Sequence, residues 1–228
     1  MKKILSVNHS FSYPDIEFDF IDEIEIDLVE TLEQYDYILV NGGDGLLRRV
    51  VKKLYQRGYD IPIILNPQGT FNVLYHLYKL GKIDHILKKI SQNDTLKEKQ
   101  IEYYTINKEE IFIFSAGNSL DAIYIAISDI LRMGFLKKSK LRYLFAFLSI
   151  IPLLILFIPF FLLHKKSFLF FKLNIPIKKF LQIFFTLSDL NIESNNKHYL
   201  LQLDGDLVSI ISDNLQIRQE DYFRLIIG

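Results

Sequence analysis

Three glycines surround one carboxylate in the segment Asn41-Gly42-Gly43-Asp44-Gly45. Residues without a Cβ let the backbone approach a phosphate group closely and point its N–H groups at it. The apolar run before this segment is typical of a strand, and the pattern after it predicts a helix, whose positive N-terminal end favours an anion. This turn is a candidate phosphate-binding loop; an Asp-containing turn or a helix cap is the alternative.

A second turn, Asn66-Pro67-Gln68-Gly69-Thr70, follows another short apolar run and leads through Phe71 to Asn72. A helix is expected from about residue 72 to residue 80. The Thr70 hydroxyl and the Asn72 amide could meet the same ligand as the first turn. In parallel sheets the ligand site lies beyond the carboxyl ends of the strands, so both turns are expected at one edge.

The elements that must position these turns follow the order β-turn-α-β-turn-α, typical of a parallel sheet with crossover helices. Strands are expected at 3–7, 36–40 and 61–65, and the stretch 10–30 reads as turn-rich and acidic. The first helix, which Gly58 would close, has apolar residues at helical spacing. Its other face carries Arg48, Arg49, Lys52 and Lys53. Such an arginine pair usually lies on a solvent-exposed helix face; direct contact with phosphate is the alternative.

The second half of the chain has a different pattern. Short β-branched or aromatic runs occur at 101–105, 111–115, 168–177, 180–187, 198–203 and 221–227, with one helical region at 121–132. The predicted fold class is an α/β nucleotide-binding domain with a parallel sheet, followed by a β-rich second domain. The expected boundaries are 1–97, joined by a C-terminal strand near 215–228, and 98–214.

Composition excludes several classes of chemistry. The 228 residues contain 27 basic and 27 acidic side chains and no cysteine. Thiolate nucleophiles, disulfides and cysteine-type metal sites are therefore absent. Because no broad cationic surface is expected from this balance, we expect no nucleic-acid partner.

An uncharged apolar segment spans residues 143–163 and has basic residues on both sides. It is long enough to cross a bilayer as a helix, but Pro152 and Pro159 interrupt it. A membrane span, an interfacial insertion and a buried core helix are the three interpretations, of which interfacial insertion is favoured. The N-terminal apolar run is too short for a signal peptide, so we expect a cytoplasmic protein that is peripheral on the inner membrane face.

The ordered set of motifs resembles the diacylglycerol kinase catalytic domain family, which includes bacterial lipid kinases and sphingosine kinases. The resemblance rests on Gly42-Gly43-Asp44-Gly45, on Gly69-Thr70-Phe71-Asn72, on Ala116 to Ala122 and on Asp204-Gly205-Asp206. The basic and apolar stretch 137–147 is similar to a family segment as well. The first motif alone also occurs in NAD kinases, whose soluble substrate would not require an apolar segment.

This resemblance implies an ATP-dependent lipid kinase that phosphorylates diacylglycerol or a related lipid alcohol drawn from the membrane. It implies that the glycines of both turns, with Asn8, Thr70 and Asn72, bind ATP, and that Asp44 contacts the phosphates and Mg²⁺. It also implies that Asp204 is the general base, which would take the proton of the attacking hydroxyl. From the residues alone, Asp204-Gly205 is an ordinary hairpin turn between 198–203 and 207–211.

Four positions depart from the family pattern at the nucleotide edge. Leu46 stands where a threonine is expected, Arg48-Arg49 where an Asn-Glu pair is expected, and Val73 where an aspartate is expected. The alternative is therefore a catalytically impaired homologue that acts as a nucleotide-binding or lipid-binding regulatory protein.

Overall fold

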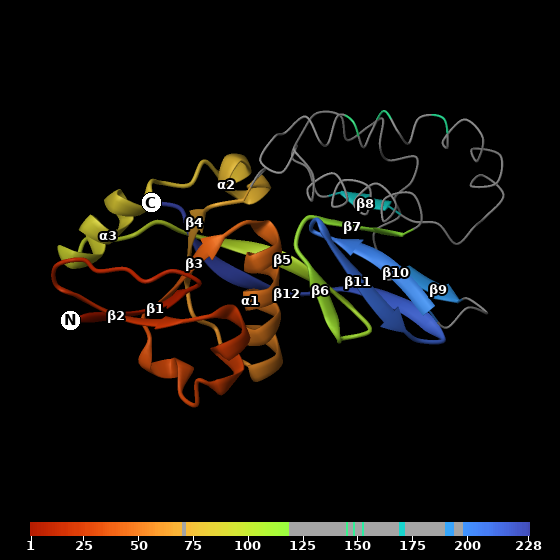
Figure 1. Cartoon of the computed structure of the whole chain (residues 1–228), viewed down its shortest axis with the longest axis horizontal. Helices are drawn as coiled ribbons and strands as arrows, with labels where there is room; N and C mark the ends of the chain where they lie inside the picture. Colours follow the sequence, from red (N-terminus) through yellow and green to blue (C-terminus); the bar gives the residue numbers. More distant parts are fainter. Residues whose placement is uncertain are drawn as a thin grey trace. The chain divides into compact units, whose positions relative to one another are not determined.

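The computed structural model describes residues 1–69, 72–118, 145, 148, 152, 169–171, 190–193 and 198–228. The chain divides into two compact units, 1–103 with 220–228, and 104–219. The first unit is α/β and the second is antiparallel and β-rich, which confirms the predicted fold class (Figure 1). The domain boundaries expected from the sequence, 1–97 with 215–228 and 98–214, remain predictions.

Four neighbouring strands of the first unit run parallel in the order β2-β1-β3-β4, and β12 pairs in parallel with β4. Their bounds are Lys2–Val7 (β1), Ile16–Ile21 (β2), Tyr37–Gly42 (β3), Ile63–Pro67 (β4) and Asn214–Ile226 (β12). In the register of β3 and β4, Asn41 lies opposite Asn66 and Gly42 opposite Pro67. Both glycine turns therefore leave the sheet at the same carboxyl edge, as predicted.

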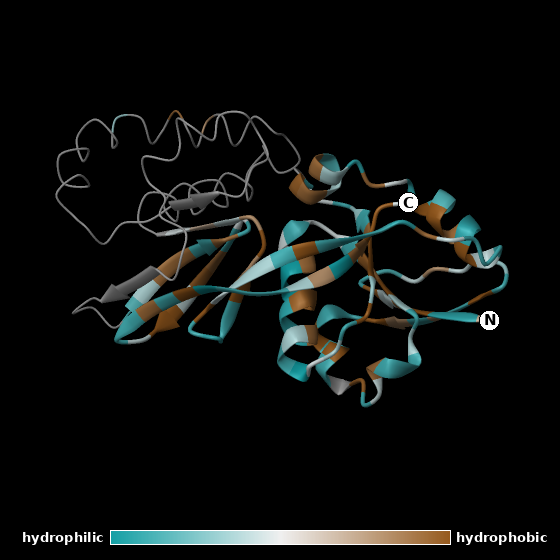
Figure 2. Cartoon of the chain, turned by 180° about the vertical axis from the view of Figure 1, so that it is seen from behind, coloured by the Kyte–Doolittle hydropathy of each residue, from teal (hydrophilic) through white to brown (hydrophobic). Residues whose placement is uncertain are grey.

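Helices pack against this sheet. Their bounds are Asp44–Arg57 (α1), Val73–Tyr78 (α2) and Ile83–Ser91 (α3), with 3-10 turns at Glu23–Leu28 (η1) and Leu32–Gln34 (η2). One face of the sheet forms a core with the buried residues of α3. The helix α3 was not predicted from the sequence. On α1, which contacts β3, apolar and polar residues alternate (Figure 2). Gly58 closes α1 with a φ of 71°, as expected for a C-terminal cap.

The segment before the first glycine turn, residues 1–41, contains no α-helix. Its parallel strands β1 and β2 are joined directly by residues 8–15. Phe11, Tyr13 and Phe18 pack onto the core that α3 also covers. The expectation of a turn-rich stretch without a strand at 10–30 is wrong, because β2 lies within it. The alternation in β2 of apolar residues with Glu17 and Asp19 is that of a solvent-facing strand.

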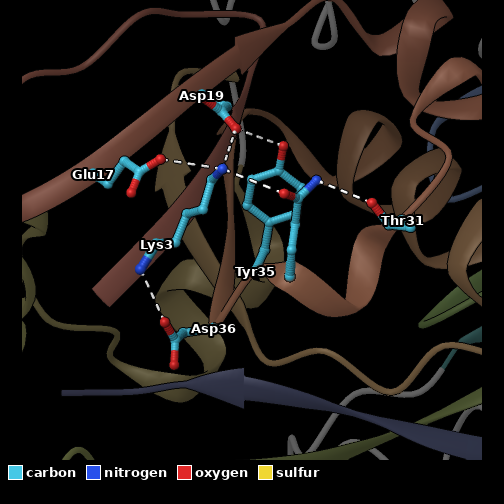
Figure 3. A network of polar contacts seen from close by, with 7 residues as sticks. Lys3, Glu17, Asp19, Thr31, Tyr35 and Asp36 are labelled. Carbon is cyan, nitrogen blue, oxygen red and sulfur yellow. Dashed lines mark hydrogen bonds and ion pairs between the residues drawn. The ribbon is translucent and has the colours of Figure 1, made fainter. Parts of the chain in front are cut away.

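A network of polar contacts joins β1, β2 and the segment that follows η2 (Figure 3). The Nζ atom of Lys3 on β1 lies 3.1 Å from Glu17 and 3.0 Å from Asp19 on β2. The Tyr35 hydroxyl donates to Asp19 at 2.7 Å. This hydrogen bond and that of Lys3 hold the pKa of Asp19 below its usual value. Burial and then the Asp19 contact raise the pKa of Tyr35 to about 12.

The expected solvated face of α1 is wrong for Arg48 but not for Arg49, whose side chain is 39% exposed. Arg48 is only 3% exposed. Arg49 forms an ion pair with Glu23, and its Nη2 atom lies 3.1 Å from the Glu23 carboxylate. This ion pair forms because η1 packs along α1 and brings Glu23 to the polar face of the helix.

The second unit contains a sheet with the order β11-β10-β7-β8. The bounds of its strands and of the remaining ones are Glu98–Ile106 (β5), Glu110–Phe112 (β6), Ser115–Asn118 (β7), Leu169–Phe171 (β8), Leu190–Glu193 (β9), His198–Leu203 (β10) and Asp206–Ile211 (β11). The β10–β11 hairpin confirms the turn at Asp204-Gly205, and both turn residues have positive φ, 49° and 94°.

Several predicted features lie outside the described residues. They are the helical region 121–132, the run 180–187, the run 168–177 apart from 169–171, and residues 119–122 of the motif that begins at Ala116. The stretch 137–147 and the apolar segment 143–163 also lie outside them, apart from residues 145, 148 and 152. No helix among the described residues combines the length and the hydropathy that a membrane span requires.

Candidate functional site

The two glycine turns pack directly against each other. A Cβ atom built on Gly69 would lie 2.7 Å from the Cα atom of Gly43, and one on Gly43 would lie 3.1 Å from the Cα atom of Gly69. The Gln68 N–H group donates to the Gly42 carbonyl at 3.0 Å. A side chain at Gly69 would collide with the backbone and one at Gly43 would be tight, so two stretches of bare backbone lie together beyond the ends of β3 and β4.

Asn72 holds the second turn closed. Its Oδ1 atom accepts from the Gly69 N–H group at 2.9 Å, and its Nδ2 atom donates to the Gly69 carbonyl at 2.8 Å. Asn72 itself has a φ of 47° and stands immediately before α2. Thr70, the remaining predicted residue of this turn, lies outside the described residues.

Asp44 connects the first turn to the second. It is 7% exposed at the start of α1, and its carboxylate accepts from the N–H groups of Val73 at 2.7 Å and Leu74 at 3.2 Å. Burial raises the pKa of Asp44, while these two N–H groups oppose the shift. The alternative interpretation of Asp44 as a helix cap applies to α2 rather than to α1.

Leu46 and Gly45 belong to the first turn of α1 rather than to the loop. Leu46 packs onto Gly42, where an added Cβ would come within 2.4 Å of its Cδ2 atom. The departure from threonine at this position therefore places an apolar side chain over the first glycine of the turn.

Asn8, which was predicted to bind ATP, contacts the start of η1. It follows β1 with a φ of 66°, and its Oδ1 atom accepts from the Glu23 N–H group at 2.8 Å. Its side chain thus fixes the start of η1.

Sequence reasoning missed a row of polar side chains below the turns. Asn66 on β4 donates to Asn41 on β3, which donates in turn to Ser6 on β1. The signal that could have revealed this row is that two successive apolar runs end in asparagine, at Asn41 and Asn66.

Asp204 belongs to the second unit and is described there by itself. It is 4% exposed, and its carboxylate accepts from the N–H groups of Ile113 at 2.6 Å, Phe114 at 2.9 Å and Ser115 at 2.8 Å. Its own N–H group donates to the Ser115 carbonyl at 2.9 Å. The side chain thereby anchors the β10–β11 turn to the segment before β7.

The described residues include no group of three acidic or histidine side chains arranged to hold a metal ion. Two cavities of about 710 and 430 Å³ lie at the opposite, amino-terminal end of β3 and β4, and they share Gly58, Tyr59 and Asp60 among their lining residues. Neither cavity is lined by a residue of the glycine turns.

Residues 17–103 match the diacylglycerol kinase catalytic domain, which confirms the family resemblance for this region. A protein of Streptococcus pneumoniae named "Putative lipid kinase" is 28% identical over 110 residues, which are 46% of this chain and 35% of that relative. The match therefore spans about a third of the relative's length.

Solved structures agree with this fold over the whole chain. A structure titled "putative diacylglycerol kinase" from Bacillus anthracis has a TM-score of 0.61 and 14% identity, with 100% of this chain and 95% of that chain covered. Another diacylglycerol kinase structure from the same organism has a TM-score of 0.58 and 14% identity, with 100% and 97% covered.

Proposed function

We propose that this protein is an ATP-dependent lipid kinase that transfers the γ-phosphate of ATP to the hydroxyl of diacylglycerol or a related lipid alcohol. The observation that carries the proposal is the contact between Gly43 and Gly69, which leaves two stretches of backbone without side chains at the carboxyl edge of a parallel sheet. The family match over residues 17–103 supports the same activity.

The chain's own residues fit a triphosphate. Gly42, Gly43, Gly69 and Asn72 would border the phosphates, and the N-terminal end of α1 favours their negative charge. Asp44 would hold the second turn in place and contact the metal ion directly or through water. Bound ATP with Mg²⁺ supplies the transferable phosphoryl group and neutralises its charge.

In this proposal Asp204 takes the proton of the lipid hydroxyl, as the family resemblance implies. The three backbone N–H groups on its carboxylate support a fixed orientation for this side chain. The apolar segment 143–163 would insert at the membrane interface and bring the lipid to the protein on the inner face of the membrane.

The test is ADP release by the purified protein with Mg-ATP in mixed micelles. The micelles contain diacylglycerol, monoacylglycerol, a sphingoid base or no lipid acceptor. Release with only one of these lipids supports the kinase and names its substrate class. Absence of release with every lipid, together with measurable ATP or vesicle binding, would contradict the kinase and favour the binding-only alternative.

A further inference from the structure

Three polar side chains form a hydrogen-bonded row across β1, β3 and β4, one residue below the glycine turns. The Nδ2 atom of Asn66 donates to Asn41 Oδ1 at 2.9 Å, and Asn41 Nδ2 donates to Ser6 Oγ at 3.0 Å and to the Val7 carbonyl at 2.9 Å. Ser6 is 0% and Asn41 3% exposed. Buried polar groups are costly unless they are paired, and backbone hydrogen bonds already join these strands. The row is therefore not required for strand pairing.

The row fixes the orientation of each amide. The Val7 carbonyl can only accept, so the NH₂ group of Asn41 must face β1 and its oxygen must face β4. Asn66 therefore turns its own NH₂ group toward Asn41, and its Oδ1 atom lies at the opposite edge of the amide, facing away from Asn41. Within the described part of the chain, this half-buried residue has no donor to Oδ1. Pro67 and the second glycine turn follow directly.

We propose that Asn66 is a specificity-determining residue that accepts a hydrogen bond from the nucleoside part of the bound nucleotide. This inference rests on the proposed function. Phosphate oxygens at neutral pH only accept hydrogen bonds, so a carbonyl oxygen does not attract them. A ribose hydroxyl or an exocyclic base amine is a donor and matches this acceptor. Asn41 and Ser6 are positioning residues that keep the Asn66 oxygen turned away from the row.

The test measures equilibrium binding of Mg-ATP and of tripolyphosphate to the wild type and to Asn66→Leu. Asn66→Leu keeps the side-chain size but removes the acceptor. We expect it to weaken ATP binding by about 2- to 13-fold, the usual range for one hydrogen bond, and to leave tripolyphosphate binding unchanged. 2′-Deoxy-ATP, 3′-deoxy-ATP and purine riboside triphosphate each lack one candidate donor. The analogue that binds wild type and variant equally identifies the donor.

A second variant guards against loss of folding. Asn66→Thr keeps a hydroxyl donor, one bond closer to the backbone than the amide nitrogen, and has no oxygen at the position of Oδ1. It should lose ATP affinity like Asn66→Leu, and the melting temperatures of both variants show at which temperature each is folded for the binding measurement. Ser6→Ala, at the far end of the row, should weaken ATP binding by about two-fold at most, because the Val7 carbonyl still orients Asn41.

Equal ATP affinity in wild type and both Asn66 variants would overturn the inference while leaving the nucleotide site intact. An equal loss of ATP and tripolyphosphate binding would also overturn it, because Asn66 would then act on the turns as a whole. If the wild type bound neither ligand, the proposed function itself would be contradicted. The proposed contact between Asn66 and the nucleoside would then be contradicted as well.

Discussion

A Cβ atom on Gly69 would lie 2.7 Å from the Cα atom of Gly43, so the two turns that follow β3 and β4 touch through their backbones. This contact joins motifs that the sequence separates by a helix and a strand. It places the N-terminal end of α1 and the start of α2 at one edge of the sheet. The proposed nucleotide site follows from this convergence.

Gly69→Ala should disrupt both turns. The added methyl group would lie 2.6 Å from Asn72 Oδ1 as well as against Gly43. We expect a loss of about 1–3 kcal/mol in the free energy of unfolding and a fall of about 10-fold or more in ATP affinity. Chemical denaturation and titration calorimetry measure the two effects.

Gly58→Ala is the control for Gly69→Ala, because it strains the left-handed cap of α1 at a φ of 71° with no atom within 4 Å of the new Cβ. It should cost about 1 kcal/mol of stability and leave ATP affinity unchanged. Loss of ATP affinity in both variants alike would assign the effect of Gly69→Ala to general destabilisation.

Asp44→Asn should loosen the second turn. One of the two carboxylate oxygens that accept from Val73 and Leu74 would become an NH₂ group facing an N–H donor. The expected loss is about 1–3 kcal/mol in the free energy of unfolding, with weaker ATP binding. Asp27→Asn, which removes an exposed ion pair with Lys53, should change stability by less than about 1 kcal/mol. Equal stabilities of the two variants would show that the contacts of Asp44 are not needed to hold α2.

The sequence predicted the parts of the fold that depend on local pattern. Buried apolar runs identified β1, β3 and β4, and helical spacing with Gly58 at its end identified α1. The edge strand β2 was missed because Glu17 and Asp19 lie among acidic neighbours that also suit a loop. The cap that Asp44 provides for α2 was not predictable, because it depends on residues 29 and 30 positions away.

The same limit applies to Asp204. Its turn with Gly205 was predictable from two β-type runs around an Asp-Gly pair. Its three N–H donors come from residues about 90 positions earlier, which no local pattern indicates. The burial of Arg48 was missed for a related reason, since a helix pattern alone does not show what packs against its polar face.

Asp204→Asn should separate catalysis from binding. We expect turnover to fall by roughly 100-fold or more, because the amide cannot take up the lipid proton, while ATP affinity stays the same. Stability should fall by about 1–3 kcal/mol, since an NH₂ group would face one of the backbone donors. Assays of lipid-dependent ADP release and ATP binding are run at a temperature where the variant is folded.

Gly205→Ala strains the same turn, at a φ of 94°, but keeps the carboxylate. It should lose about 1 kcal/mol of stability and retain turnover. An unchanged rate in Asp204→Asn would remove this residue from the mechanism.

Tyr35→Phe should change the response of the protein to alkaline pH. The pKa of Tyr35 is raised from 10.0 to about 12, so its neutral form is favoured in the folded state. Its contribution to stability is therefore complete below pH 10 and is lost as the pH rises toward about 12. Urea denaturation of both proteins between pH 8 and pH 12 tests this. A stability difference that stays constant over this range would contradict the raised pKa of Tyr35, whose causes are burial and then the hydrogen bond to Asp19.

The central claim is that the paired glycine turns hold ATP for transfer of its γ-phosphate to a lipid. The most direct measurement follows labelled γ-phosphate from Mg-ATP into lipid in mixed micelles, with wild type and Gly69→Ala side by side. The account predicts labelled lipid with the wild type and at least about 10-fold less with the variant. Absence of labelled lipid with the wild type, or equal labelling by both proteins, would contradict it.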